Sequence, residues 1–284
     1  MKISVITSLY KCEKYLTGFL KHLSKTDNLN ECEFIFIHNK PQGNEEKIIE
    51  HFILEHPEIN VKYIKLDYVE TLYASWNRGV NNSGGKYIAI WNVDDIRMPD
   101  SLRIQAQALD ENPNAKICYG DIHGMEKYGV LEGKLFYHPV YPEKKNNFLR
   151  SHFIGCFPMW KREIHNKVGY FDEQYRLVGD YEFQIRAARN FEFVKANKVL
   201  GYYSINGKNQ LSSNFRLQNA ERTSVEIRYG VYDKINLLYF FKAIKNYKIY
   251  KCLYNGEYHN INKYFNNHLS YVLLRIPLII GAFI

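Results

Sequence analysis

The 284-residue sequence predicts an α/β fold in which a mostly parallel sheet is flanked by helices and followed by a C-terminal helical extension. Two observations predict this fold. Short apolar runs alternate with amphipathic stretches through the first part of the chain, and only short links separate them. Several of these runs are apolar on both faces, which is typical of parallel strands that helices cover on both sides. Such a sheet binds ligands at the carboxyl ends of its strands.

The individual elements of the first part follow from periodicity and from turn residues. Gly84 and Gly85 separate a helix from the strand that comes after it. The expected strands are residues 2–9, 33–38, 61–66 and 86–91, and the expected helices between them are residues 13–24, 45–54 and 70–81.

The second part of the chain has a weaker pattern. A helix is expected from Asp100, whereas residues 121–141 mix glycine, histidine and aromatic residues without helical period. We expect that stretch to be irregular and partly antiparallel. Regular structure is expected again in helices from Lys161 and from Asp180, with a turn at residues 169–173 between them.

The composition is that of a globular protein, because 46% of the residues are hydrophobic and the chain can bury one large core plus an appendage. We expect one α/β domain over residues 1–215 and a basic, tyrosine-rich helical extension over residues 216–284. The five cysteines are an odd number with no C-x-x-C spacing, which argues against a disulfide framework and a zinc site. Together with the absence of a leader-like pattern at residue 1, this predicts a cytoplasmic protein.

The net charge of +8 is concentrated in the last quarter of the chain, where ten Lys or Arg stand against four Asp or Glu from Arg216 onward. Residues 234–284 are therefore candidates for peripheral contact with an acidic membrane surface, at the inner face of the membrane. The apolar stretch at the end is too short to span, and it contains Arg275 and Pro277. Packing on the protein, or between copies in a homo-oligomer, is an equal alternative.

Two adjacent carboxylates follow the fourth strand. The apolar run 86–91 leads through Asn92 into Asp94 and Asp95. Adjacent carboxylates repel each other and are costly to desolvate, so they favour a site where a hard cation such as Mg²⁺ or Mn²⁺ neutralises them. Such a cation would bind phosphate oxygens. The pair by itself is equally typical of a loop before the helix at Asp100.

These carboxylates belong to a longer set of motifs that resembles glycosyltransferase family 2, whose fold is GT-A, a nucleotide-binding α/β domain. The resemblance runs in order over roughly residues 2–215, and the ordered set is more specific than any single motif. Its members are Ser4–Tyr10, His38–Asn39, Trp76–Gly79, Gly85–Asp95, Gly169–Glu173 and Gly179–Phe183.

The resemblance implies transfer of a sugar from a nucleotide diphosphate donor to an acceptor hydroxyl, with inversion at the anomeric carbon. It implies that Asp94 holds Mn²⁺ or Mg²⁺ against the diphosphate, with Asp95 as a second ligand or a sugar contact. Asp180 matches the general base that accepts the proton of the acceptor hydroxyl. On the residues alone Asp180 is a helix N-cap. Glu182 is the neighbouring alternative on the acceptor side.

Five residues match positions that contact the donor. Ser8 and Tyr10 follow the first strand, where the tyrosine ring would pack on the base. Asn39 stands where the family usually has an acidic residue, and its amide can still pair with uracil. Asn77 lies in the Trp76–Gly79 motif. Asn92 replaces the first aspartate of the usual D-x-D pattern, and it can bond the ribose but adds no charge to the metal.

The lid and the acceptor side are expected in the variable stretches. Residues 202–213 match a mobile loop that closes over the donor in relatives, and Lys208 would contact the diphosphate there. Tyr137 and Trp160 could stack on sugar faces of the acceptor, with core packing as an equal alternative. Three histidines are also present in the irregular region, where surface or packing roles are the simpler interpretation, and they are His123, His138 and His152.

The combined prediction is a metal-assisted inverting glycosyltransferase of the hexosyl or N-acetylhexosaminyl type, active in polysaccharide biosynthesis. We expect a UDP-sugar donor and a glycan or lipid-linked glycan acceptor. The alternative is a degenerate fold of this family that binds glycan or membrane without turnover. A sugar nucleotidyltransferase is disfavoured because no glycine-rich loop follows the first strand. Nucleic-acid binding is disfavoured because no recognition motif accompanies the basic residues.

Overall fold

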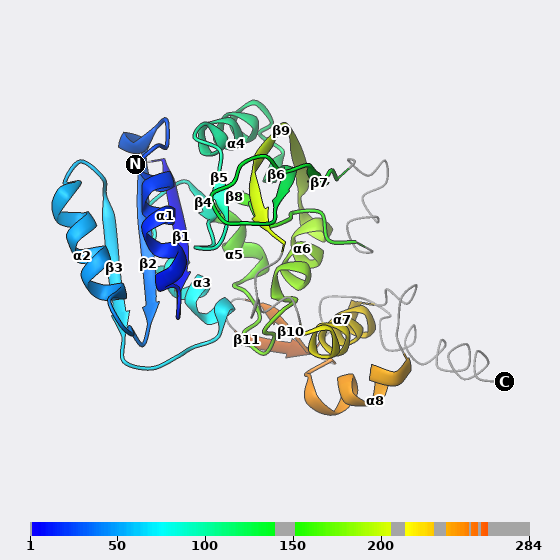
Figure 1. Cartoon of the computed structure of the whole chain (residues 1–284). Coiled ribbons are helices and arrows are strands. Elements are labelled where there is room, and N and C mark those ends of the chain that lie inside the picture. The colour runs from blue at the N-terminus through cyan, green and yellow to red at the C-terminus, as the bar shows by residue number, and fades with distance from the viewer. Residues whose placement is uncertain are drawn as a thin grey trace.

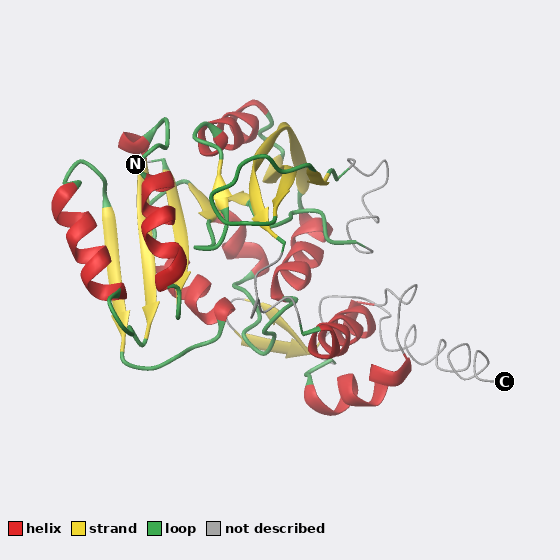
Figure 2. Ribbon diagram, in the orientation of Figure 1, coloured by secondary structure: helices red, strands yellow, loops and turns green. Residues whose placement is uncertain are grey.

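The computed structural model describes residues 2–139, 151–205, 214–229, 237–249, 251–254 and 257–260. One mixed sheet forms the centre, with strand order β3-β2-β1-β4-β8-β6-β9-β5 and with β7 paired to β6. Helices lie around it on both faces (Figure 1, Figure 2). Its strands are β1 (Ile3–Leu9), β2 (Cys32–Asn39), β3 (Val61–Leu66), β4 (Tyr87–Ile90), β5 (Ile96–Arg97), β6 (Ala115–Met125), β7 (Leu135–Tyr137), β8 (Met159–Lys161) and β9 (Glu192–Ser204).

The first half of the sheet is parallel, as the sequence predicts. β1 lies between β2 and β4 and runs parallel to both, and β2 runs parallel to β3. The helices of the described residues are α1 (Glu13–Leu23), α2 (Glu45–Glu55), α3 (Leu72–Asn81), α4 (Ser101–Glu111), α5 (His165–Val168), α6 (Gly179–Asn190), α7 (Phe215–Tyr229) and α8 (Leu237–Asn246), with 3-10 turns at Leu29–Glu31 and Arg162–Ile164.

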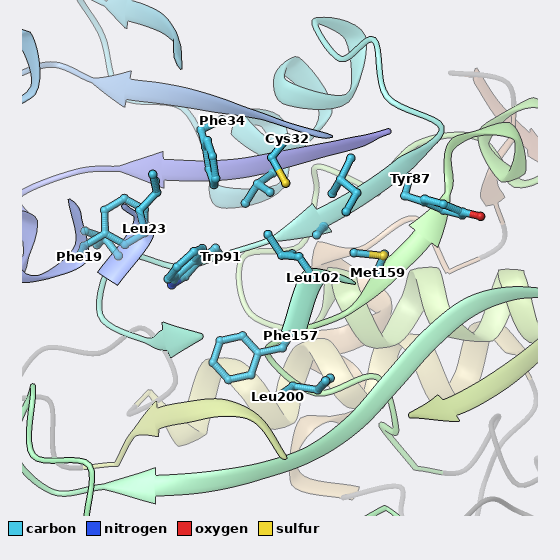
Figure 3. Packing of buried hydrophobic residues seen from close by; sticks show 14 of the residues in the cluster. Phe19, Leu23, Cys32, Phe34, Tyr87, Trp91, Leu102, Phe157, Met159 and Leu200 are labelled. Atoms are coloured by element: carbon cyan, nitrogen blue, oxygen red, sulfur yellow. The ribbon is translucent and has the colours of Figure 1, made fainter. Parts of the chain in front are cut away.

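Neighbouring residues of β1 face two different cores. Val5 belongs to a cluster that α1, α2 and α4 cover, in which the rings of Phe19 and Trp91 meet edge to face at 5.3 Å (Figure 3). Ile6 belongs to the cluster on the other face, with Trp76 of α3 and residues of α5, α6 and α7. Each large apolar side chain buried in this way contributes about 1.5–3 kcal/mol. Because both faces of the sheet are apolar, helices pack against each of them.

The second half of the sheet differs from the sequence prediction. Residues 121–125, expected to be irregular, complete the long strand β6, which pairs in parallel with β9 and antiparallel with β8 and β7. The antiparallel pairing of β6 with β7 agrees with the partly antiparallel structure expected for residues 121–141. The β6–β9 pairing contains irregular registers near Gly120 and Asp121. The apolar alternation is interrupted along these strands, so local periodicity did not reveal them. Gly201 allows β9 to approach β5, since a Cβ there would lie 2.4 Å from the carbonyl oxygen of Ile96.

The C-terminal extension begins as part of the second core. Val225 and Tyr229 of α7 are buried in the same cluster as α3 and α6, so the described structure does not separate at residue 215. Beyond α8, strands β10 (Lys251–Tyr254) and β11 (Glu257–Asn260) form an antiparallel hairpin that the sequence pattern did not predict. In the part of the chain that the structure describes, no helix is long and apolar enough to cross a membrane. Residues 261–284 lie outside the described part.

Candidate active site

Parallel pairing brings the predicted donor residues to one edge of the sheet. Leu9 at the end of β1 pairs with His38 near the end of β2, and Ile6 of β1 pairs with Ile90 at the end of β4. The segments that follow these strands therefore leave the sheet at the same edge. The ends of these strands and the segments after them carry the predicted donor and metal residues Ser8, Tyr10, Asn39, Asn92, Asp94 and Asp95.

The two adjacent carboxylates have different surroundings. Asp95 is 1% exposed, and its carboxylate accepts hydrogen bonds from the amide of Asn92 at 3.2 Å and from the backbone N–H of Ser204 at 3.2 Å. Burial, followed by repulsion from Asp94, raises the pKa of Asp95 well above its usual range. Asp94 is half-buried. Asp94 is therefore the carboxylate of the pair that reaches the surface, while Asp95 ties the turn to the end of β9.

The turn fits one mode of cation binding. Among the described residues, no group of three or more His, Cys, Asp or Glu side chains gathers in a metal-binding arrangement. Mg²⁺ in phosphate-transfer and related sites is often held by one or two carboxylates together with substrate phosphates and water. A cation at Asp94 completed by a donor diphosphate matches that mode, whereas an all-protein cage does not.

Asn39 lies beneath this edge of the sheet. It is 1% exposed, its amide donates to the hydroxyl of Ser75 at 2.9 Å, and its oxygen accepts from the backbone N–H of Glu70 at 3.0 Å. These contacts attach α3 and the segment before it to the end of β2. The polar atoms of the Asn39 side chain therefore already have partners in the protein, and the expected uracil contact stays a prediction.

Ser8 and Tyr10 remain at the surface of the same edge. Ser8 is half-buried, and Tyr10 has 43% of its surface exposed, with the ammonium of Lys11 5.2 Å from its ring centre. Lys11 has a φ of +48°, a left-handed conformation that is uncommon outside glycine. An exposed aromatic ring beside a cation at a strand end is available to a planar, charged ligand such as a nucleotide.

Asp180 lies in the first turn of α6, one residue inside the helix, so it is not the N-cap. Glu221 of α7 accepts instead from the N–H groups of Arg176, Leu177 and Val178 before the helix. One Asp180 oxygen accepts from the hydroxyl of Tyr73 at 3.1 Å and from the N–H of Tyr181 at 2.8 Å. The side chain is 25% exposed. Asp180 thus keeps access to a ligand while Tyr73 fixes one oxygen.

The first turns of α3 join the two groups of residues. Ser75 is bonded to Asn39 at the end of β2, and Tyr73, two residues earlier, is bonded to Asp180 at the start of α6. Gly179 lets α6 start directly against this tyrosine, because a Cβ there would lie 2.7 Å from the ring. The carboxylate of Asp180 is therefore positioned relative to the sheet edge through α3.

His152 lies beside Asp180 in the structure, a neighbour that the sequence did not predict. Its Nε2 atom lies 3.5 Å from the second oxygen of Asp180, and its side chain is 34% exposed. The two residues are 28 positions apart in an irregular part of the sequence, so no local motif links them. The sequence signal was a histidine in the irregular region of the chain.

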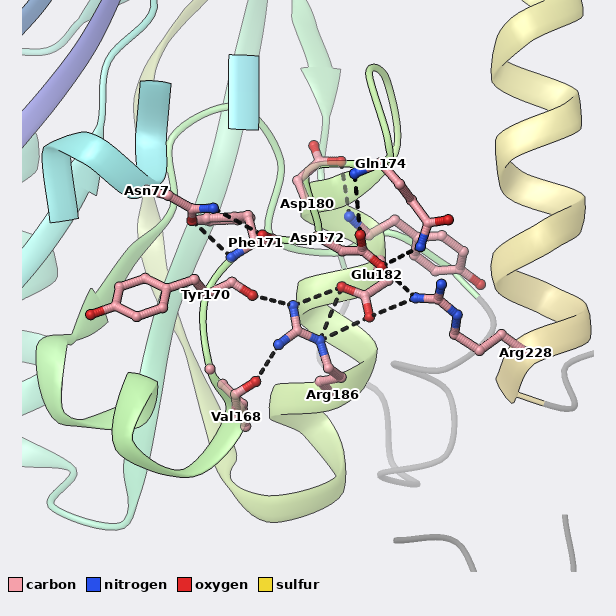
Figure 4. A network of polar contacts seen from close by, with 12 residues as sticks. Asn77, Val168, Tyr170, Phe171, Asp172, Gln174, Asp180, Glu182, Arg186 and Arg228 are labelled. Carbon is pink, nitrogen blue, oxygen red and sulfur yellow. Dashed lines mark hydrogen bonds and ion pairs between the residues drawn. The ribbon is translucent and has the colours of Figure 1, made fainter. Parts of the chain in front are cut away.

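Three residues predicted for the site bond to the interior of the protein. Asn77 binds the backbone of Phe171 through its oxygen and its amide at 2.9 Å each, which fixes the turn before α6. Glu182 is fully buried and pairs with Arg186 (Figure 4). Trp160 is 1% exposed and donates to His165 at 2.9 Å. The ligand contacts expected of these three residues stay predictions.

Tyr137 and Lys208 are the remaining residues predicted for the site. Tyr137 is half-buried and its hydroxyl donates to the backbone oxygen of His152, so it supports the segment beside Asp180. Lys208 lies outside the described residues, as does the greater part of the predicted lid. A surface depression of about 620 Å³ is lined by residues such as Glu111, His138 and Lys195 at the amino ends of β6 and β9. It contains none of the residues predicted for the site.

Comparison with known proteins assigns the family. The model of glycosyl transferase family 2 matches residues 4–169. An uncharacterized glycosyltransferase of Methanocaldococcus jannaschii is 26% identical over 76% of this chain and 75% of its own length. The uncharacterized glycosyltransferase YwdF of Bacillus subtilis is also 26% identical, over 74% of this chain and 77% of its own length.

Solved structures agree in fold. Staphylococcus aureus TarS (residues 1–349), in complex with UDP-GlcNAc, superposes with a TM-score of 0.64 at 17% identity, over 86% of this chain and 79% of TarS. The mannosyltransferase PcManGT of Pyrobaculum calidifontis, in complex with GDP-Man and Mn²⁺, gives a TM-score of 0.58 at 13% identity, over 99% of this chain and 75% of its own. The sheet flanked by helices is thus the GT-A fold. The chain belongs to glycosyl transferase family 2 and is a glycosyltransferase.

Proposed function

We propose that this glycosyltransferase moves a sugar from a UDP-sugar to a hydroxyl of a glycan or lipid-linked glycan, with inversion and with help from Mn²⁺ or Mg²⁺. The observation that carries the proposal is the carboxylate of Asp180, which is part-exposed and is held by Tyr73 from a helix that is also bonded to the end of β2. A base is thereby fixed relative to the strand ends where GT-A sheets receive a nucleotide.

Donor binding is assigned to the edge formed by β1, β2 and β4. Tyr10 offers an exposed ring for the base, and Ser8 offers a hydroxyl beside it. Asp94 faces the diphosphate, and a cation bound there would offset the negative charge that develops on the leaving nucleotide. Asp95 supports this turn from below through Asn92 and Ser204.

The acceptor is assigned to the side of Asp180. The acceptor hydroxyl attacks the anomeric carbon from the face opposite the leaving diphosphate. The proton of that hydroxyl passes to the Asp180 carboxylate oxygen that Tyr73 does not bind. The new bond joins the acceptor oxygen to the sugar, and the nucleotide diphosphate leaves with the electron pair of the broken bond. Direct displacement of this kind inverts the configuration.

Support for UDP comes from a structural neighbour, because TarS was solved with UDP-GlcNAc. PcManGT was solved with GDP-Man, which makes the base of the nucleotide the first property to test. We expect metal-dependent nucleotide release from one donor in a panel of UDP-, GDP- and dTDP-sugars with Mn²⁺, and loss of that release with EDTA.

The substitution Asp94→Ala tests whether Asp94 binds the metal ion. We expect the Mn²⁺ concentration for half-maximal release to rise at least about tenfold, since loss of a ligand removes charge and geometry together. Asp27→Ala is the matched control, an exposed carboxylate far from β4 in sequence, and it should leave the value unchanged. Absence of turnover and of metal-dependent nucleotide binding with every donor would instead favour a degenerate, non-catalytic protein.

The basic extension is proposed to hold the enzyme at an acidic membrane surface. Lys242 and Lys245 of α8 are both exposed. We expect the protein to bind anionic vesicles in low salt and to bind them at least severalfold more weakly after Lys242→Glu with Lys245→Glu, because each basic residue near such a surface contributes about 1 kcal/mol. Lys21→Glu with Lys47→Glu is the control of equal charge. Equal loss in both double variants, or no binding by the wild type, would contradict the membrane contact.

A further inference from the structure

The segment before β8 is held firmly against the helix that carries Asp180. Gln184, one helical turn after Asp180, accepts from the backbone N–H groups of Phe153 at 2.6 Å and Ile154 at 3.2 Å, and it donates to the oxygen of Ser151 at 2.8 Å. Gln184 is fully buried. Three hydrogen bonds to one side chain therefore fix the backbone on both sides of His152.

A second contact fixes the same segment from the sheet. The hydroxyl of Tyr137, at the end of β7, donates to the backbone oxygen of His152. The imidazole lies edge-on to the ring of Tyr181 with centres 6.4 Å apart, and its Nε2 atom faces the outer oxygen of Asp180 at 3.5 Å. The position of this ring is thus set by α6 and β7 together and not by its own loop alone.

We propose that His152 is a positioning residue for the base: its Nε2–H group orients the outer oxygen of Asp180 toward the acceptor hydroxyl. The inference rests on the proposed role of Asp180. Tyr73 and the N–H of Tyr181 occupy one carboxylate oxygen. The Nε2 atom of His152 has no hydrogen-bond partner among the described residues and lies 3.5 Å from the other oxygen. A hydrogen bond donated there leaves one lone pair of that oxygen to receive the proton of the acceptor.

The test compares His152→Ala and His152→Gln in the full-length protein with a saturating donor and acceptor. We expect His152→Ala to lower kcat about 10- to 100-fold through misplacement of the base, while KM for the donor changes less than about twofold. His152→Gln can still donate a hydrogen bond to the Asp180 carboxylate. It should recover at least about a third of wild-type kcat.

The control is His138→Ala, which removes a histidine that also pairs with an aspartate, its Nδ1 lying 2.9 Å from Asp121. That variant should keep the wild-type kcat. If Asp180→Asn abolishes transfer but His152→Ala does not lower kcat, or if His152→Gln recovers none of the activity that His152→Ala loses, the role of His152 is refuted while the proposed function stands. If Asp180→Asn has no effect on transfer, the assignment of the base fails first.

Discussion

Asp180→Asn should lower kcat for sugar transfer by about 10²- to 10⁴-fold, the range that a positioned general base contributes. The amide cannot accept the proton of the acceptor hydroxyl. It can still accept the hydrogen bonds that Tyr73 and the N–H of Tyr181 give to the carboxylate in the wild type. The substitution therefore removes the base and leaves the contacts that hold the start of α6.

The measurement is the rate of sugar transfer to the acceptor at a saturating donor concentration. Donor binding and thermal unfolding are measured on the same variants. Donor affinity and the unfolding midpoint should stay near the wild-type values, because the donor is assigned to another edge of the site. Glu192→Gln, at an exposed carboxylate at the start of β9, is the matched control and should retain full activity. Wild-type kcat in Asp180→Asn would contradict the assignment of the base.

Arg228→Met should lower the free energy of unfolding by about 3–5 kcal/mol, which is the usual cost of breaking a buried ion pair from one side. Arg228 of α7 is fully buried, and its guanidinium lies 2.7 Å from Asp172 and 3.4 Å from Glu182 (Figure 4). Methionine fills similar space but leaves two buried carboxylates with one fewer positive partner. Arg186 still pairs with Glu182, so Asp172 bears the larger loss.

Denaturant unfolding at several pH values measures this effect. Burial opposes the charged form of Asp172, but the charge of Arg228 and hydrogen bonds outweigh it and hold the pKa of that carboxyl below its usual range. A lowered pKa means stabilisation that is present above the unfolded-state pKa of about 3.9 and is lost as the pH falls through the folded-state value. The difference between wild type and variant should therefore shrink below about pH 4.

The exposed Arg176, just before α6, provides the control for this substitution. Arg176→Met should change the free energy of unfolding by no more than about 0.5 kcal/mol, as is usual for surface positions. The network also reaches the β10–β11 hairpin, because the hydroxyl of Tyr258 in β11 donates to Asp172 at 2.5 Å. An unchanged stability in Arg228→Met would mean that α7 and the hairpin are not coupled to α6 through these charges.

The sequence by itself determined the parallel first half of the sheet and the family. Apolar runs such as residues 33–38 are buried on both faces and are separated by amphipathic helices, so local periodicity is sufficient to identify them. The position of Asp94 and Asp95 after β4 followed in the same way, since both lie next to a strand end. These features depend on residues that are close together in the sequence, so the sequence alone is sufficient to predict them.

Only the tertiary structure decided where the polar residues of these motifs lie and what they contact. Asn77 and Glu182 stand in motifs of the family, yet each is buried by contacts with residues at least 46 positions away, Phe171 for the first and Arg228 for the second. Asp95 differs from Asp94 because Ser204, which is 109 positions away in sequence, bonds its carboxylate. His152 faces Asp180 because Gln184 and Tyr137 hold its segment. Such roles depend on which side chains burial brings together, and no pattern along the chain encodes that directly.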